Sequence, residues 1–258
     1  MDHNLGTKSG RRDFFDRLLS TSNLQSHSLN IFDEVIVEDC YRLFDCVNGF
    51  DLNQRNEINI IDVGSHEGFF SLYAYELLKL LPEIKESSIK LFSIEGDEQN
   101  ARLTQEKLQN ATNHQVLNKL CAAPGEEYRF KFVHKNTTAG FIYVKSLEEL
   151  ERFKPSWKNK GVIEEVEPGS ACLDLSSITK GMKDIFFLKM DCEGCEYTTL
   201  ENMFHNGEIS KVDNLGIELH KTEKEREDLF LKLKDEFGHC EVVNEDYRLA
   251  VFSRKSVF

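Results

Sequence analysis

The sequence predicts an α/β fold built on a mostly parallel sheet, and three observations lead to this prediction. From residue 58 onward, short apolar, β-branched runs alternate with stretches of helical apolar spacing. Helices of this length between successive strands are typical of right-handed βαβ units, whose strands lie parallel. The last two strand candidates, at 241–243 and 247–252, are separated by only three residues, which predicts an antiparallel hairpin at the end of the chain.

The elements of this domain follow in order along the chain. Asp97 is placed to cap one helix, Thr222 and Glu225 have the spacing of a capping box, and Gly238 is a stop signal. We expect strands at 58–63, 89–94, 114–122, 185–190 and 212–219, and helices at 69–81, 97–109, 197–204 and 222–237.

Two further segments are expected: one precedes the domain at 58–258, and the other interrupts it. Residues 1–57 carry apolar residues at mixed helical spacing and are expected to form an N-terminal helical segment that ends at Asn48-Gly49. An insertion at about 125–183 begins with a predicted hairpin and continues as a charged stretch over 146–169. It either covers the carboxyl edge of the sheet, where loops carry specificity, or is a solvated excursion.

The composition limits the possible partners. The 258 residues contain 32 Lys and Arg against 45 Asp and Glu, a net charge of −13. This charge argues against a reader of duplex nucleic acid and against recruitment to anionic lipid, and it favours a neutral, cationic or sulfonium ligand. The longest apolar runs have four residues, too few to span a membrane. The oligomeric state cannot be derived from the sequence.

Cysteine usage predicts the compartment. The chain has seven cysteines, an odd number, and no secretory signal is recognisable. We therefore expect reduced thiols, no disulfide framework and a cytoplasmic location.

The first motif is the segment from Ile60 to Ser71, where an apolar strand opens through Gly64 and Gly68 into a helix. A dinucleotide fingerprint starting at Gly64 would need glycine at positions 66 and 69, which are His66 and Phe69, and no phosphate-loop lysine follows. A nucleoside without a phosphate chain fits this turn better.

The second motif ends the next strand with Glu95-Gly96-Asp97. A carboxylate at this position can accept hydrogen bonds from both hydroxyls of a ribose, although Glu95 could also merely cap the following helix. Together with Asp62 and the glycine turn, Glu95 indicates a pocket for an adenosine with a cationic tail.

The third motif is the run Leu188-Lys189-Met190-Asp191-Cys192-Glu193-Gly194-Cys195-Glu196, in which three carboxylates cluster where a strand gives way to a helix. Such a cluster can stabilise positive charge, accept a proton from a hydroxyl or hold a divalent cation. Acidic residues that only complement the helix dipole would look similar.

These three motifs resemble the FkbM family of S-adenosylmethionine-dependent methyltransferases, over about residues 58–252. The resemblance implies a Rossmann-like class I methyltransferase fold: a mostly parallel seven-stranded sheet with helices on both faces and a C-terminal antiparallel hairpin. It also implies S-adenosylmethionine as cofactor and O-methylation of a hydroxyl on a small molecule, sugar or glycan. The cofactor residues that it implies are Asp62, Gly64, Ser65, His66, Gly68, Glu95, Gly96, Asp97 and Ala122.

The chain departs from the family pattern in two places. Ser65-His66 replaces a small residue followed by asparagine, and Gly96 replaces a common proline. Neither change removes a carboxylate or a glycine, so the expected cofactor site is intact and the acceptor preference is open.

Methyl transfer to a hydroxyl requires a group that accepts the hydroxyl proton, and the candidates are Asp191, Glu193 and His220. Asp191, Glu218 and His220 could also ligate a divalent cation such as Mg2+, although we favour a site without metal. The spacing Cys192-x-x-Cys195 permits a redox pair, but a small residue near a helix start is the simpler interpretation.

Two other functions compete with the methyltransferase. A nicotinamide-dependent oxidoreductase is suggested by the Tyr-x-x-x-Lys spacing of Tyr75 and Lys79, which lies too early in the chain. A catalytically inactive, methyltransferase-like binding protein would keep the pocket without turnover. NADH binding tests the first alternative, and cofactor binding without turnover would indicate the second.

Overall fold

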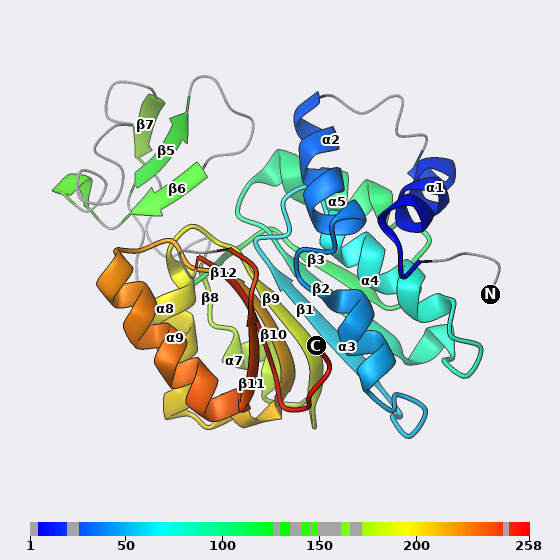
Figure 1. The fold of residues 1–258 in the computed structure, drawn as a ribbon. Coiled ribbons are helices and arrows are strands. Elements are labelled where there is room, and N and C mark those ends of the chain that lie inside the picture. The colour runs from blue at the N-terminus through cyan, green and yellow to red at the C-terminus, as the bar shows by residue number, and fades with distance from the viewer. Residues whose placement is uncertain are drawn as a thin grey trace.

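The computed structural model describes residues 5–19, 26–125, 130–134, 141–144, 146–148, 161–165, 172–244 and 248–258. At its centre is a seven-stranded sheet with the order β11-β12-β10-β9-β1-β2-β3 (Figure 1). Five neighbouring strands pair in parallel and β12 runs antiparallel to both β10 and β11, so the predicted α/β fold is confirmed. The strands are β1 (Ile58–Val63), β2 (Ile89–Ile94), β3 (His114–Leu117), β9 (Ile185–Met190), β10 (Val212–Glu218), β11 (His239–Val242) and β12 (Leu249–Ser253).

Helices cover both faces of this sheet, which is why its central strands are apolar along their whole length. In β1, Ile58 and Ile60 pack with the core on one face, whereas Ile61 and Val63 pack with the core on the other. Figure 1 shows α8 and α9 on one face and α3 and α4 on the opposite face. The helices are α1 (Lys8–Leu19), α2 (Ser26–Phe32), η2 (Asp33–Val37), α3 (Leu43–Gly49), α4 (Phe69–Lys79), η3 (Glu86–Ser88), α5 (Glu98–Lys107), α7 (Ser176–Thr179), α8 (Cys195–His205), η5 (Glu208–Lys211) and α9 (Glu223–Phe237).

The N-terminal segment is helical as predicted, but it is broken between η2 and α3. Asp39 and Arg42 both have positive φ angles, 51° and 50°, which no helix interior accommodates. The buried carboxylate of Asp39 accepts hydrogen bonds from the backbone N–H groups of Leu43 and Phe44, at 2.9 and 3.2 Å. These bonds satisfy free donors at the start of α3 and fix the break there.

The elements of the sheet were predicted well, because capping residues and apolar periodicity are local patterns in the sequence. Asp97 caps α5 by accepting from the backbone N–H of Asn100, and the capping box of Thr222 and Glu225 starts α9, which Gly238 ends. The strand predicted at 114–122 is instead divided. Its second part, β4 (Leu120–Cys121), pairs with β8 (Cys172–Leu173) outside the main sheet.

The insertion contains a second, three-stranded sheet with the order β6-β5-β7. β5 (Phe130–His134) and β6 (Phe141–Val144) pair antiparallel, as the predicted hairpin requires. β7 (Gly161–Glu165) corrects the expectation of an irregular charged stretch: its Val-Ile pair, in a segment otherwise rich in charge, forms a strand against β5. The remainder of 146–169, apart from 146–148, lies outside the described residues, as do residues 245–247 of the terminal hairpin.

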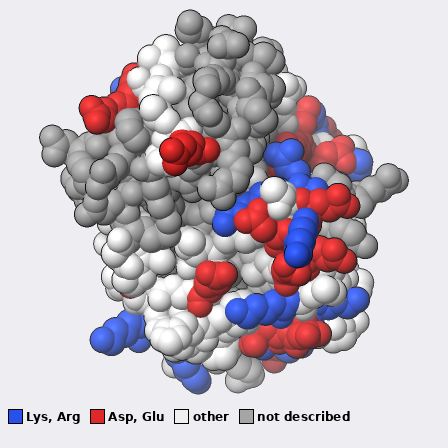
Figure 2. All heavy atoms as spheres, turned by 90° about the vertical axis from the view of Figure 1, so that its left-hand side faces the viewer, with Lys and Arg blue, Asp and Glu red and all other residues white. Residues whose placement is uncertain are grey.

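Charges on the face that carries α8 and α9 are mixed. Figure 2 shows acidic and basic side chains interspersed over the described part of this face, so neither sign dominates it. No helix in the described ranges has the length and apolar character needed to cross a bilayer.

Candidate functional site

A cavity of about 330 Å³ lies at the carboxyl ends of the central strands. The order β10-β9-β1-β2 brings the loops after these strands together, although they are far apart in sequence. The N-terminal segment contributes the remaining wall. The lining residues used below are Glu34, Tyr41, Gly64, Ser65, His66, Glu95, Gly96, Cys121, Lys189, Asp191, Cys192, Glu193, Cys195, Glu218, His220 and Arg248.

The turn after β1 contains the two glycines, and the structure assigns them different tasks. Gly64 has a φ of 73°, and a Cβ added there would lie 1.8 Å from the backbone oxygen of Asp191. Gly68 starts α4 with a φ of 79° and lies against Thr104 of α5, away from the cavity. Glycine is therefore required at both positions, at Gly64 by the neighbouring loop and at Gly68 by helix packing.

Ser65 and His66 complete the turn and line the cavity. The Ser65 hydroxyl is buried and has no hydrogen-bond partner among the described residues. An unpaired buried hydroxyl is costly, so a ligand that bonds to it would be favoured.

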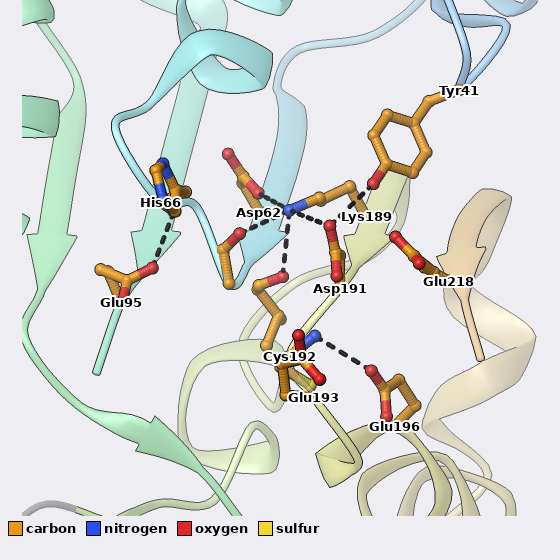
Figure 3. A network of polar contacts seen from close by, with 12 residues as sticks. Tyr41, Asp62, His66, Glu95, Lys189, Asp191, Cys192, Glu193, Glu196 and Glu218 are labelled. Atoms are coloured by element: carbon orange, nitrogen blue, oxygen red, sulfur yellow. Dashed lines mark hydrogen bonds and ion pairs between the residues drawn. The ribbon is translucent and has the colours of Figure 1, made fainter. Parts of the chain in front are cut away.

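Glu95 lies at the cavity with its carboxylate held by two backbone groups. The N–H of His66 donates to Oε2 at 2.7 Å (Figure 3). The N–H of Asp97 donates to Oε1 at 2.8 Å. Burial raises the pKa of Glu95, and these two N–H groups partly oppose that rise. Each carboxylate oxygen keeps a lone pair for a further donor, which suits a pair of ligand hydroxyls.

Besides Gly68, three of the predicted cofactor residues are placed away from the cavity wall. Asp97 caps α5 and pairs with Lys131 of β5 at 3.4 Å. Ala122 is buried and donates its N–H to the oxygen of Leu173, while its neighbour Cys121 lines the cavity instead.

Asp62 is the third. It is fully buried, with an exposed fraction of 0%, and accepts a hydrogen bond from the Ser71 hydroxyl at 2.7 Å. Its Oδ1 lies 3.2 Å from Nζ of Lys189, which also donates to the backbone oxygen of Gly64 at 2.5 Å. Figure 3 shows the Lys189 ammonium between these groups. The ion pair of Asp62 and Lys189 therefore fixes the glycine turn through the bond to the Gly64 oxygen.

The carboxylate cluster predicted from the third motif is brought together. The side chain of His220 is 3% exposed; its Nε2 lies 3.5 Å from Asp191, 3.6 Å from Glu218 and 3.9 Å from Glu193. Its Nδ1 lies 2.8 Å from Glu196, whose carboxylate also accepts the backbone N–H groups of Cys192 and Gly194. The imidazole is thus held in one orientation.

Three groups of the cluster, His220, Glu218 and Asp191, have a pKa that is shifted for an identifiable reason. Burial opposes the charged form of His220, but Glu196, followed by Glu193 and Asp191, raises its pKa to about 10. Burial and the charge of Asp191 raise the pKa of Glu218 to about 7, against the effects of His220 and Arg248. Burial would raise the pKa of Asp191, but Lys189, His220 and the Tyr41 hydroxyl hold it below its ordinary value. At neutral pH Asp191 is therefore ionised and His220 is protonated.

The cavity residues that the sequence analysis missed include Tyr41, Glu34, Arg248 and Lys189. Tyr41 donates its hydroxyl to Asp191 Oδ2 at 3.2 Å, and Arg248 pairs with Glu218 at 2.5 Å. Glu34 lines the cavity from η2, and burial followed by the charge of Asp191 raises its pKa. Only Lys189 carried a signal, because a lysine inside an otherwise apolar strand needs a buried partner.

The expectation of seven reduced cysteines is wrong. Cys192 and Cys195 form a disulfide, whereas the other five cysteines are free. The loop between them brings their Cα atoms to 5.6 Å, within the range that a disulfide bridges, and the odd number of cysteines did not reveal this local pair.

The possible metal ligands also converge. Asp191, Glu218 and His220 each offer a ligand atom, and these atoms lie within 4.8 Å of one another. Lys189 and Arg248 already supply positive charge to the two carboxylates. Our interpretation without metal stays a prediction.

The residues that suggested an oxidoreductase lie elsewhere. The Tyr75 hydroxyl donates to Glu86, and the Lys79 ammonium lies 4.9 Å from the centre of the Tyr75 ring. Neither residue lines the cavity. Nothing in their placement supports hydride transfer there.

Comparison with known proteins adds one finding. Residues 62–249, most of the chain, match the family described as the methyltransferase FkbM domain. This range includes the glycine turn of the first motif and the whole of the second and third motifs. No curated protein sequence matches the chain.

Proposed function

The chain belongs to the FkbM methyltransferase domain family, and we propose on this premise that it transfers the methyl group of S-adenosylmethionine to a hydroxyl on a small molecule, sugar or glycan. One observation carries the proposal. The Gly64 turn and Glu95 share a single cavity with a cluster of carboxylates at the ends of β9 and β10. The cavity would therefore hold the nucleoside next to the group that accepts the proton.

The residues present fit the cofactor. Glu95 would accept the two ribose hydroxyls, and the unpaired hydroxyl of Ser65 offers a further polar contact. Asp191, which is kept ionised, would favour the positively charged end of the ligand. Four of the predicted cofactor residues support the pocket from behind its wall and do not touch the ligand: Asp62, Gly68, Asp97 and Ala122.

The mechanism divides among the chain's own residues. S-adenosylmethionine supplies an electrophilic methyl group on a sulfonium, and the protein aligns the acceptor with it. We assign Glu218 as the group that takes the hydroxyl proton, because a carboxylate with a pKa of about 7 combines basicity with ionisation at neutral pH. Asp191 and Glu193 stabilise positive charge, and protonated His220 balances the three carboxylates.

Calorimetric titration with S-adenosylmethionine tests the cofactor, with NADH as the control ligand. We expect micromolar binding of S-adenosylmethionine and none of NADH. Glu95→Gln should weaken this binding, whereas Glu98→Gln, an exposed glutamate in the first turn of α5, should leave it unchanged. Binding of NADH alone would refute the proposal.

Turnover separates the enzyme from a binding protein. Methyl-labelled S-adenosylmethionine is incubated with a panel of sugars, glycans and small alcohols, and transferred label is counted. We expect transfer to a hydroxyl, which Glu218→Gln slows by about 100-fold without loss of cofactor binding. Tight binding with no transfer to any member of the panel would favour a binding protein.

A further inference from the structure

We propose that Cys192 and Cys195 are a redox-modification site in the cavity wall, and that their disulfide holds the loop after β9 in the form that binds S-adenosylmethionine. The proposal rests on the proposed function for its ligand. Both cysteines line the cavity, and five further cysteines of the chain are unbonded.

The disulfide closes a loop that contains Glu193, one of the carboxylates of the cluster. Glu193 and Gly194 have consecutive positive φ angles, 56° and 114°. Glycine adopts this region freely, but a glutamate there is disfavoured. The loop therefore needs restraints, and the structure shows two. One is the disulfide, and the other is Glu196, which accepts the N–H groups of Cys192 and Gly194 at 3.0 and 2.8 Å.

Movement of this loop would reach both halves of the cavity. The Glu193 carboxylate lies 3.9 Å from His220, so a change of its backbone conformation removes it from the cluster. On the other side, the backbone at Asp191 and Cys192 packs so closely on Gly64 that no Cβ fits between them. Release of the loop thus loosens the turn that we assign to the cofactor.

Thiol–disulfide exchange at this pair is chemically reasonable. A thiolate of a dithiol attacks the sulfur of the half-buried residue Cys192 from the cavity, the S–S bond breaks, and Cys195 leaves as a thiolate that takes up a proton. The second thiol then attacks the mixed disulfide and releases Cys192 as a thiol, while the dithiol, which has supplied two electrons, becomes a disulfide. Cys195 begins α8, and the helix N-terminus favours a thiolate leaving group.

The other cysteines are poorly suited to such a response. Burial raises the pKa of the thiols of Cys40, Cys46 and Cys121, so little thiolate forms there at neutral pH. Cys172 and Cys240 are half-buried but unbonded. A change on mild reduction therefore points to Cys192 and Cys195.

The experiment first counts thiols. Protein that is denatured and alkylated without reductant should carry five adducts, and seven after treatment with dithiothreitol. S-adenosylmethionine affinity is then measured by calorimetry on the oxidised and reduced forms, with circular dichroism to verify folding. We expect reduction to weaken binding by about tenfold. Without the disulfide, Glu193 can leave its left-handed backbone conformation, and the preference of a non-glycine residue for other conformations corresponds to a population change of about that size.

Two variants make the result specific. Cys192→Ser/Cys195→Ser should bind like the reduced protein and ignore dithiothreitol, whereas Cys240→Ser should keep the full response. Seven adducts before reduction, or equal affinity of the oxidised and reduced forms, would overturn the proposal. If neither the oxidised nor the reduced protein binds S-adenosylmethionine, the proposed function is wrong. The role of Cys192 and Cys195 in that function is then wrong as well.

Discussion

The buried pair of Lys189 and Asp62 allows a stringent test of how the glycine turn is held. Substitution Lys189→Met keeps the length of the side chain but removes its charge. Asp62, with an exposed fraction of 0%, then loses the ammonium 3.2 Å away and keeps only the Ser71 hydroxyl. Removal of one partner from a buried ion pair costs about 3–5 kcal/mol in the free energy of unfolding. We expect a loss near the lower end of this range, because the Ser71 bond remains.

The assay is urea unfolding at pH 7, followed by circular dichroism. In the double variant Asp62→Asn/Lys189→Met the buried charge is gone, so the protein should recover to within about 1–2 kcal/mol of the parent, the remainder being the lost bond to the Gly64 oxygen. Lys79→Met, which breaks a partly exposed pair, is the control and should cost about 0–1 kcal/mol. A loss below about 1 kcal/mol for Lys189→Met, or a double variant no more stable than the single one, would refute the reasoning.

Four further predictions follow from the site and the core. Glu95→Ala should weaken S-adenosylmethionine binding by about 1–3 kcal/mol in calorimetry, and unchanged affinity would remove Glu95 from the ribose. Methyl transfer should rise as pH increases through about 7, because Glu218 must lose its proton, and Glu218→Gln should lower the rate by about 100-fold and flatten the profile. Burial raises the pKa of Asp39 to about 7 from 3.8, so its contribution to stability is present below pH ~4 and lost as pH rises through 7. Asp39→Asn should remove about 3 kcal/mol of this dependence between pH 5 and 8, measured by urea unfolding at both pH values. EDTA or Mg2+ should leave cofactor affinity unchanged, and a magnesium requirement would make Asp191, Glu218 and His220 metal ligands.

The positions of the site residues along the chain were predictable, and their roles were only partly so. Glu95 and Asp191 were correctly placed at strand ends, because an apolar run that stops at a carboxylate is a local pattern. The family resemblance placed Asp62 at the cofactor as well, and the structure buries this side chain against Lys189. Glu95 and Asp191 point into the cavity, whereas Asp62 points into the protein interior. Successive residues of a strand point to opposite sides, so a position near the end of a strand does not by itself fix the direction of the side chain.

The sequence by itself determined the order of strands and helices, the glycine turn, and the cluster of acidic residues after β9, because periodicity, capping and burial act over a few residues. Only the tertiary structure decided which distant groups meet. It brought Tyr41 from the N-terminal segment to Asp191 and paired Lys189 with the turn 125 residues earlier. These contacts depend on how two faces of a sheet are covered and on which loops end side by side, and no local pattern in the chain records that geometry.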